Sequence, residues 1–286
     1  MKIQDPNHFY QLFVSNKINL QTLLEYLLTI IDKSEVLEHR IKSIELLNNL
    51  ELRDKNVNRL IENILVSDEN YIIRALGFKY LLSNEPHSAS EILKWAILND
   101  SSTLFLRDIK KYFNPNEVTS IRTIFEQRIE TYSQNLQLYS IETHFLIDLG
   151  IELNSLNLIL TNFDVYYIQG EKLLLLIKDQ RIHELNLVSR LESIPESIGN
   201  LTELEVLNLS YNNLITLPKT IKSLKKLRIL DLSWNNFVNI PKSIIELPSL
   251  RVLDLGHNYI DEIPERLLSL KEKVNVSLAD NPISMK

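Results

Sequence analysis

The sequence predicts an α+β solenoid, in which helical repeats are followed by an array that stacks into a curved parallel sheet. Three observations predict it. A skeleton of leucine, asparagine and proline returns every 23 residues between Ile182 and Ile283. Apolar residues at helical spacing fill the N-terminal part of the chain. Short apolar runs beside turn residues lie between these two parts and are typical of strands.

The helical part is expected over residues 1–132, where one layout occurs three times. Each copy starts with an acidic or hydroxyl residue, continues with an arginine, and then carries apolar residues at helical spacing: Ser34 to Leu50, Asp68 to Leu82, and Asp100 to Phe113. The layout resembles HEAT-type helical repeats over residues 18–132. The resemblance implies that the arginines (Arg40, Arg74 and Arg107) hold neighbouring repeats together rather than bind a ligand.

Residues 133–164 show no clean period, and we expect connecting helices there. Strand-like runs follow at Tyr166 to Ile168 and at Lys172 to Ile177, and the leucines of the second run favour a buried strand. The open end of a repeat array exposes unpaired backbone groups and apolar side chains, so it needs a cap. We therefore expect residues 165–286 to form one domain that begins with a β cap.

Three full copies of the 23-residue skeleton begin at Leu204, Leu227 and Leu250. A shorter copy precedes them, and a truncated one follows. The skeleton, Leu-x-x-Leu-x-Leu-x-x-Asn-x-Leu-x-x-Leu-Pro-x-x-Ile-x-x-Leu, resembles leucine-rich repeats. The alternating leucines should point into a core, while the asparagines turn inward and bond backbone groups on the tight curve: Asn212, Asn235, Asn258 and Asn281.

The outward positions of the repeats carry the candidate site. Neighbouring strands lie about 4.8 Å apart, so equivalent residues should form columns across the concave face. One column is apolar, one is polar, and one contains a tyrosine, a tryptophan and a histidine. Tyr and Trp dominate binding hot spots. The predicted partner-binding residues are Val206, Asn208, Tyr211, Ile229, Asp231, Trp234, Val252, Asp254 and His257. Alternatively, the aromatic residues pack on neighbouring loops and the apolar residues only favour strand.

The sequence supports an enzymatic function of the same face less well than partner binding. Asp231 and Asp254 should lie side by side with His257 nearby, and such a group would bind a cation or form a hydrolytic site. However, Arg228 and Arg251 would neutralise the aspartates, and an open face does not exclude water. The five glycines form no phosphate loop, and the absence of cysteine excludes thiolate chemistry. We therefore predict no catalytic residue, no metal and no cofactor.

The partner is predicted to be a protein. A net charge of −6 disfavours nucleic acid, and no apolar run is long enough for a membrane span. The N-terminus has no secretory signal, which together with the lack of cysteine favours a cytoplasmic protein. The first functional reading is a non-catalytic scaffold or adaptor. The Leu-Pro-x-x-Ile repeats also resemble those of Ras-group intracellular leucine-rich repeat proteins, which implies a regulatory module of a small Ras-like GTPase as the alternative.

Two further expectations concern assembly and source. We expect a monomer, with an edge-to-edge dimer through the last strand, near Asn275 to Leu278, as the alternative, because open sheet edges invite pairing. The combination of HEAT-like helices, a cap and a short leucine-rich array resembles proteins of Asgard-type archaea.

Overall fold

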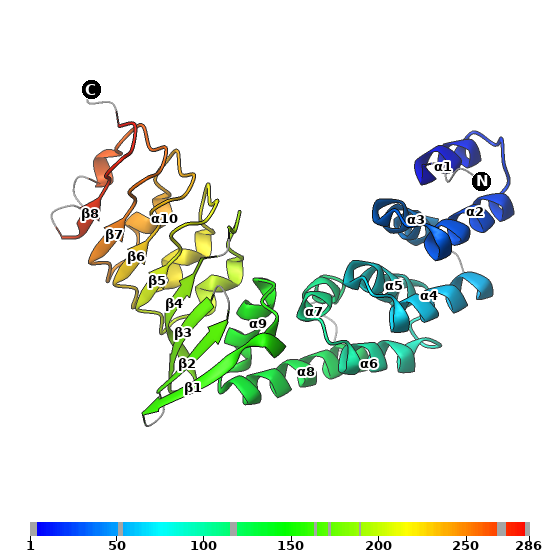
Figure 1. The fold of residues 1–286 in the computed structure, drawn as a ribbon, viewed down its shortest axis with the longest axis horizontal. Coiled ribbons are helices and arrows are strands. Elements are labelled where there is room, and N and C mark those ends of the chain that lie inside the picture. The colour runs from blue at the N-terminus through cyan, green and yellow to red at the C-terminus, as the bar shows by residue number, and fades with distance from the viewer. Residues whose placement is uncertain are drawn as a thin grey trace. The chain divides into compact units, whose positions relative to one another are not determined.

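The structure is a computed structural model, drawn in Figure 1, that describes residues 5–50, 54–114, 119–162, 165–170, 173–188, 190–267 and 273–283. Its contacts divide the chain into a helical unit, Met1–Arg128, and a repeat unit, Ile129–Lys286. The division falls inside one helix, α8 (Ser120–Leu136), whereas the sequence places the end of the helical part at residue 132.

The helical unit is built from helix pairs. Helices α2 and α3 pack together, as do α4 and α5, while α5 also packs on α3 and on α7. The three copies of the sequence layout contain α3, α5 and α7. The bounds are α1 (Pro6–Val14), α2 (Leu20–Lys33), α3 (Leu37–Leu50), α4 (Lys55–Ser67), α5 (Tyr71–Asn84), α6 (Ser90–Asn99) and α7 (Thr103–Lys110). The core between them is apolar and fully buried, with Leu27, Ile44, Ile61, Phe78 and Phe105 as examples.

Arginine–aspartate pairs link successive helix pairs, and two of the three arginines thus have the linking role that the repeat layout implies. Arg40 forms an ion pair with Asp68 and donates from Nε to the Ile31 carbonyl. Arg74 binds Asp100 through Nε (2.6 Å) and Nη2 (2.9 Å), and donates to the Asp68 carbonyl. The third copy departs, because Arg107 pairs with its own neighbour, Asp108, at 3.2 Å.

The repeat unit contains one eight-stranded sheet in chain order, β1 to β8. The first three strands form an antiparallel cap that pairs with β4, the first repeat strand, and β4 to β8 pair in parallel. Short helical turns lie on the return segments. The bounds are α9 (Ser140–Asp148), η1 (Leu153–Ser155), β1 (Asn157–Asn162), β2 (Val165–Gly170), β3 (Leu173–Lys178), β4 (Arg181–Leu187), η2 (Glu196–Asn200), β5 (Val206–Asn208), η3 (Lys219–Ser223), β6 (Ile229–Asp231), α10 (Lys242–Ile245), β7 (Val252–Asp254) and β8 (Asn275–Ser277).

Residues 133–164 were expected to form connecting helices, but the last residues of this region form a strand. Residues 133–164 do contain the end of α8, all of α9 and a short 3-10 turn, but residues 157–162 form β1, the first strand of the cap. Among the described strands it pairs with β2 alone, from Asn157 opposite Gln169 to Asn162 opposite Val165. A single apolar run without a period does not reveal such pairing, since strand formation depends on the neighbour.

Inward asparagines hold the repeats together, as the sequence predicts. Asn235, which is 3% exposed, donates from Nδ2 to the carbonyls of Leu209 (2.9 Å) and Leu232 (3.1 Å). Its Oδ1 accepts the Leu214 N–H at 3.0 Å. Each bond set spans two neighbouring copies, and the same pattern occurs at Asn212, Asn258 and Asn281. The asparagines therefore satisfy backbone groups that the turn leaves unpaired.

A buried carboxylate joins α9 to the first repeat strand. Glu142, on α9, is fully buried. Its Oε1 accepts from Arg181 Nε at 2.5 Å, and its Oε2 accepts the Ile182 N–H at 2.7 Å. Arg181 also donates to Thr202 and lies over the Tyr139 ring. The sequence does not predict this joint, because the partners are 39 and 40 residues apart with no motif between them.

Replacing an inward asparagine should destabilise the repeat unit. Asn235→Ala removes a buried side chain that pairs with at least three backbone groups, so we expect a loss of about 2–4 kcal/mol in the free energy of unfolding. Asn236→Ala is the matched control, because that side chain makes no hydrogen bond within the described residues and should lose less than about 0.5 kcal/mol. Denaturant unfolding measures both, and equal losses would contradict the assignment.

The Glu142 joint should also give a pH dependence of stability. Burial raises the pKa of Glu142 above its ordinary value, against the opposing effects of Arg181 and the Ile182 N–H. A raised folded-state pKa means that this stability is present below the unfolded pKa and is lost as pH rises through the folded one. The free energy of unfolding relative to Glu142→Gln should therefore fall with rising pH from about pH 4.

Glu203 is a control for the pH dependence of stability, because its pKa is shifted in the opposite direction to that of Glu142. The hydrogen bond from Lys226 lowers the pKa of Glu203. Its contribution is therefore present above the unfolded pKa and is lost as pH falls, so relative to Glu203→Gln the wild type should gain stability as pH rises. Denaturant titrations of the three proteins over the acid range test both signs. A wild-type curve that rises relative to Glu142→Gln would contradict the first expectation.

Candidate functional site

The parallel strands place the predicted columns in register. Strand pairing aligns Val206 with Ile229 and then Val252, and aligns Asn208 with Asp231 and then Asp254. The leucines between them are fully buried, at positions 207, 230 and 253. Six of the nine predicted residues thus lie in two adjacent columns on the outward side of β5 to β7. We call this side of the sheet, from β3 to β8, the strand face.

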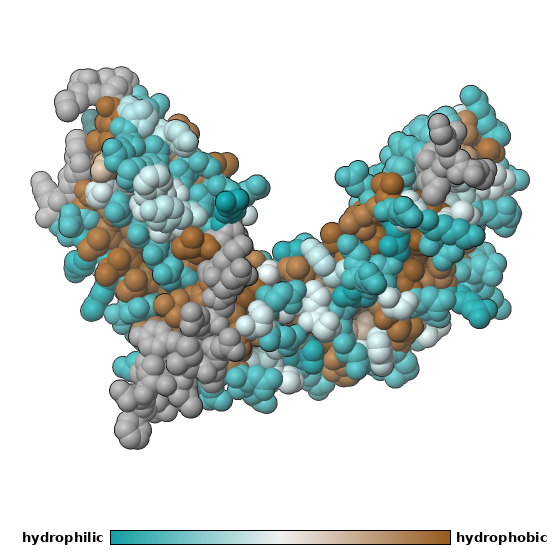
Figure 2. Space-filling view, in the orientation of Figure 1, coloured by the Kyte–Doolittle hydropathy of each residue, from teal (hydrophilic) through white to brown (hydrophobic). Residues whose placement is uncertain are grey.

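The first column is apolar although it is open to solvent. Ile229 is 40% exposed and Val252 is 37% exposed, while Val206 is half-buried. Figure 2 shows hydrophobic residues gathered along the strand side of the repeat unit, bordered by hydrophilic ones. Glu184 and Asn275 flank the column at its two ends. The strand face therefore carries an exposed apolar row whose side chains are not needed for the core beneath it.

The three remaining predicted residues form a stack. The ring centroids of Tyr211 and Trp234 are 5.3 Å apart with an interplanar angle of 10°, and those of Trp234 and His257 are 3.9 Å apart at 17°. His257 Nε2 lies 3.2 Å from Asp280 Oδ2. Tyr211 is 56% exposed and Trp234 is 46% exposed. The rings pack on one another from copy to copy, while about half of the Tyr211 and Trp234 surface stays exposed.

The stacked residues occupy an unfavourable backbone conformation. Their φ angles are 56° at Tyr211, 55° at Trp234 and 53° at His257, in the left-handed region. A residue with a Cβ loses about 1–2 kcal/mol there relative to the right-handed region, and glycine or asparagine fits more readily. The bend before each inward asparagine requires this conformation, but it does not require an aromatic side chain.

Asp231 and Asp254, in the second column, were expected to be neutralised by Arg228 and Arg251, but each binds the turn that follows its own strand. Asp231 Oδ1 accepts from the N–H and hydroxyl of Ser233, at 2.9 and 2.7 Å, and Asp254 Oδ1 accepts the Gly256 N–H at 2.8 Å. Arg228 pairs with Glu205 on the neighbouring strand at 3.4 Å, and Arg251 donates to its neighbouring carbonyl. The arginines therefore do not neutralise the aspartates, because cross-strand neighbours are closer than residues three positions along one strand.

The cap strand β3 adds two residues to the strand face that are not among the nine predicted site residues. Leu174 lies opposite Asn186 and Leu176 lies opposite Glu184, so both belong to the strand face. Leu174 is 41% exposed, which corrects the prediction that the run from Leu173 to Ile177 is a buried strand. The signal was present, since a strand with apolar residues at every position is apolar on both faces.

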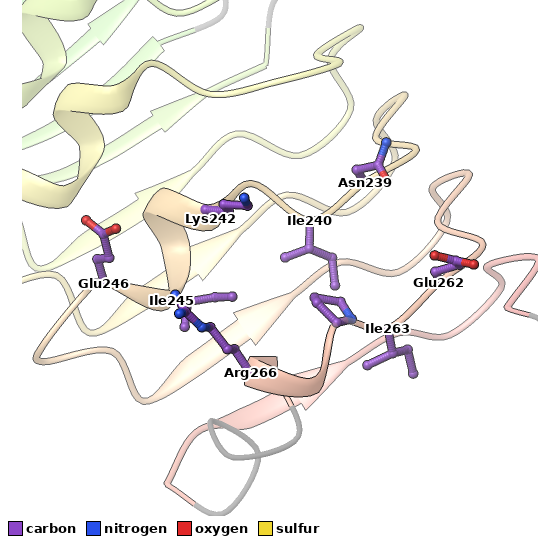
Figure 3. A pocket seen from close by; sticks show the side chains of 9 residues that line it. Asn239, Ile240, Lys242, Ile245, Glu246, Glu262, Ile263 and Arg266 are labelled. Atoms are coloured by element: carbon purple, nitrogen blue, oxygen red, sulfur yellow. The ribbon is translucent and has the colours of Figure 1, made fainter. Parts of the chain in front are cut away.

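The repeat unit also has a pocket on its return segments, shown in Figure 3. It encloses about 500 Å³. Its lining combines apolar residues with charges of both signs, from Asn239, Ile240, Lys242, Ile245, Glu246, Glu262, Ile263, Pro264 and Arg266. None of the nine predicted site residues lines it. The pocket and the strand face are thus separate features of the repeats.

The described residues contain neither a metal-binding cluster nor a membrane-spanning helix. No cluster of three or more histidine, aspartate or glutamate side chains has an arrangement that would hold a metal ion. No helix in this part of the chain combines the length and the apolar character that crossing a bilayer requires.

Comparisons with known families identify the repeats. A family model described as "Leucine rich repeat" matches residues 180–237, and a second with the same description matches residues 249–270. The chain therefore contains leucine-rich repeats, as the 23-residue skeleton predicts. No curated protein matches the chain.

Solved structures give partial likenesses only. An internalin from Listeria monocytogenes is 22% identical over 36% of this chain and 30% of its own, with a TM-score of 0.32. A leucine-rich repeat protein from Leptospira interrogans is 28% identical over 32% and 30%, with a TM-score of 0.28. A plant peptide hormone receptor, solved in complex with RGF2, is 28% identical over 32% and 19%, with a TM-score of 0.27. The chain spans less than a third of each solved chain, and we base no argument on these likenesses.

Proposed function

We propose that this protein is a non-catalytic scaffold or adaptor that binds a protein partner on the strand face of its leucine-rich repeats. Leucine-rich repeat proteins generally mediate protein–protein interactions, which supports the class of function. The main observation in favour of this function is the exposed ring stack of Tyr211, Trp234 and His257 beside the apolar column. Large aromatic and aliphatic side chains on one open face supply the contact area that protein interfaces use.

The openness of the strand face and the hydrogen bonds of its aspartates favour partner binding over catalysis. The face is an open sheet, whereas catalytic sites are usually enclosed so that water is excluded. The oxygens of Asp231 and Asp254 that hold the turns after β6 and β7 already have structural partners. We assign no catalytic residue, metal or cofactor to the chain.

A regulatory module of a small Ras-like GTPase is the second candidate. Its support is the Leu-Pro-x-x-Ile form of the return segments, which fold as the short turns η2, η3 and α10 directly after Pro195, Pro218 and Pro241. The Arg40–Asp68 and Arg74–Asp100 pairs likewise support a HEAT-like character of the helical unit. A cytoplasmic location and an Asgard-type archaeal source complete the proposal, both on the strength of the sequence.

Trp234→Ala should weaken partner binding without unfolding the protein. The expected loss is more than about 2 kcal/mol, or roughly 30-fold in Kd, because a central tryptophan commonly dominates an interface. Trp95→Ala is the matched control, since Trp95 on α6 is equally exposed at 46% but lies in the helical unit. Calorimetry with a partner purified after capture from native lysate measures both. Unchanged affinity in Trp234→Ala, or an equal loss in Trp95→Ala, would refute the proposed site.

The same purified pair distinguishes the two candidate functions. If the captured partner is a GTPase, nucleotide hydrolysis and exchange are measured with and without this protein. Binding with unchanged rates supports the adaptor, whereas changed rates support the regulatory module. A Trp234→Ala variant should lose any rate effect together with binding.

The free protein is expected to be a monomer. The alternative is pairing through the edge of β8, the last strand within the described residues. Sedimentation velocity over a hundredfold range of concentration tests this. A sedimentation coefficient that rises with concentration, and returns to the monomer value in a Val276→Pro variant, would support the edge-to-edge dimer instead.

A further inference from the structure

We propose that the partner segment on the strand face carries an arginine that binds between Asp231 and Asp254, while its apolar residues lie on the column of Val206, Ile229 and Val252. This inference rests on the proposed function and specifies the chemistry of the partner. The occupant is a linear polypeptide segment with at least one arginine beside apolar side chains.

The charges of the strand face determine where a cation would bind. Asp231 and Asp254 lie directly opposite each other on neighbouring parallel strands, which are about 4.8 Å apart. Like charges in this arrangement destabilise a sheet. Neither carboxylate forms an ion pair with any described residue, and each uses only Oδ1 in its hydrogen bonds to the following turn. The second oxygens thus remain as acceptors on an exposed apolar face.

The neighbouring arginines restrict the orientation of the partner. Arg228 and Arg251 precede β6 and β7 and lie on the other side of the apolar column from the aspartates. Glu205 compensates Arg228 at 3.4 Å. A cationic side chain is repelled from the arginine side and attracted to the aspartate side, so the charge pattern favours one placement of the segment across the strands.

The central ring of the aromatic stack does not compete for the cation. Trp234 has one ring face against Tyr211 and the other against His257. Binding of a cation by an aromatic ring requires an open ring face, and the edge of the ring carries a positive partial charge. Trp234 therefore offers the partner contact area along its edge, while the aspartates provide the negative charge.

Arginine suits the aspartate pair better than lysine does. A guanidinium group has five N–H donors in a planar fork, so it can donate to two carboxylates on adjacent strands at once. An ammonium group is a compact, strongly hydrated charge without this geometry. Asp231 and Asp254 are direct neighbours on adjacent strands, so one guanidinium group can reach both.

The test uses a displayed library of random 12-residue peptides, selected on the full chain. The selected peptides are then measured on Asp231→Asn/Asp254→Asn by fluorescence anisotropy. This variant should fold, because Asn208 occupies the equivalent position on β5 and holds its turn through the same hydrogen bond to Ser210 N. Glu246→Gln/Glu265→Gln removes the same two charges from exposed positions on the return segments and is the matched control.

The expected result has three parts. Selected peptides contain more arginine than the unselected library, together with apolar residues. They bind the double-asparagine variant at least tenfold more weakly, but the control variant within twofold of the wild type. Replacing the peptide arginine by lysine also weakens binding. Lysine peptides of equal affinity would overturn the assignment of arginine.

Other outcomes separate this inference from the proposed function. Peptides that bind the double-asparagine variant fully but lose affinity for Trp234→Ala would overturn the arginine contact and leave the strand face as the site. Peptides insensitive to both variants would overturn both. A library that yields no binder also overturns the inference, because a linear segment should be sufficient. Thermal unfolding of every variant confirms that binding is measured on folded protein.

Discussion

The repeat unit depends on one interaction, the hydrogen bonds from each inward asparagine to the backbone of its own copy and the preceding one. A turn after only three residues of strand leaves several N–H and carbonyl groups without partners. Asn235 binds the carbonyls of Leu209 and Leu232 and the N–H of Leu214. The amide side chain has both donors and an acceptor, which neither aspartate nor leucine provides. The asparagines therefore fix the spacing of the copies and, through it, the register of the columns.

The same turn explains the placement of the candidate site. The residue before each asparagine must adopt the left-handed conformation, and its side chain then lies outside the core. Aromatic residues in three successive copies are thereby stacked at the end of the strands, next to the apolar and acidic columns. The backbone strain at these positions and the like charges of Asp231 and Asp254 both oppose stability on one patch. Such patches often mark binding sites, where function conflicts with stability.

Periodic features could be predicted from the sequence, and features that depend on one distant contact could not. The 23-residue skeleton predicts the buried leucines, the inward asparagines and the columns, since every copy repeats the same constraint. The recurring arginines likewise predict contacts between repeats, although their partners, Asp68 and Asp100, come from the structure. In contrast, the Glu142–Arg181 joint involves two residues that occur once. The strand Asn157–Asn162 depends on its pairing with β2, and the exposure of Leu174 depends on which face of β3 is covered.

The candidate site, too, has features that the sequence predicts and features that it does not. Its membership follows from the period: strand pairing aligns six of the nine residues in two columns, and the rings of the other three stack on one another. Their individual partners do not follow, because the pairing of Arg228 with Glu205 is decided by the lateral distance between strands. The role of the nine residues in binding remains a prediction.

The ring stack has a consequence for the thermodynamics of association. Side chains of free surface residues lose rotational freedom when a partner immobilises them, and this loss opposes binding. Trp234 is already held on both sides by Tyr211 and His257, and His257 is held in turn by Asp280. Much of the ordering therefore occurs during folding, so an interface formed on these rings has a smaller entropic penalty than its exposed area alone implies.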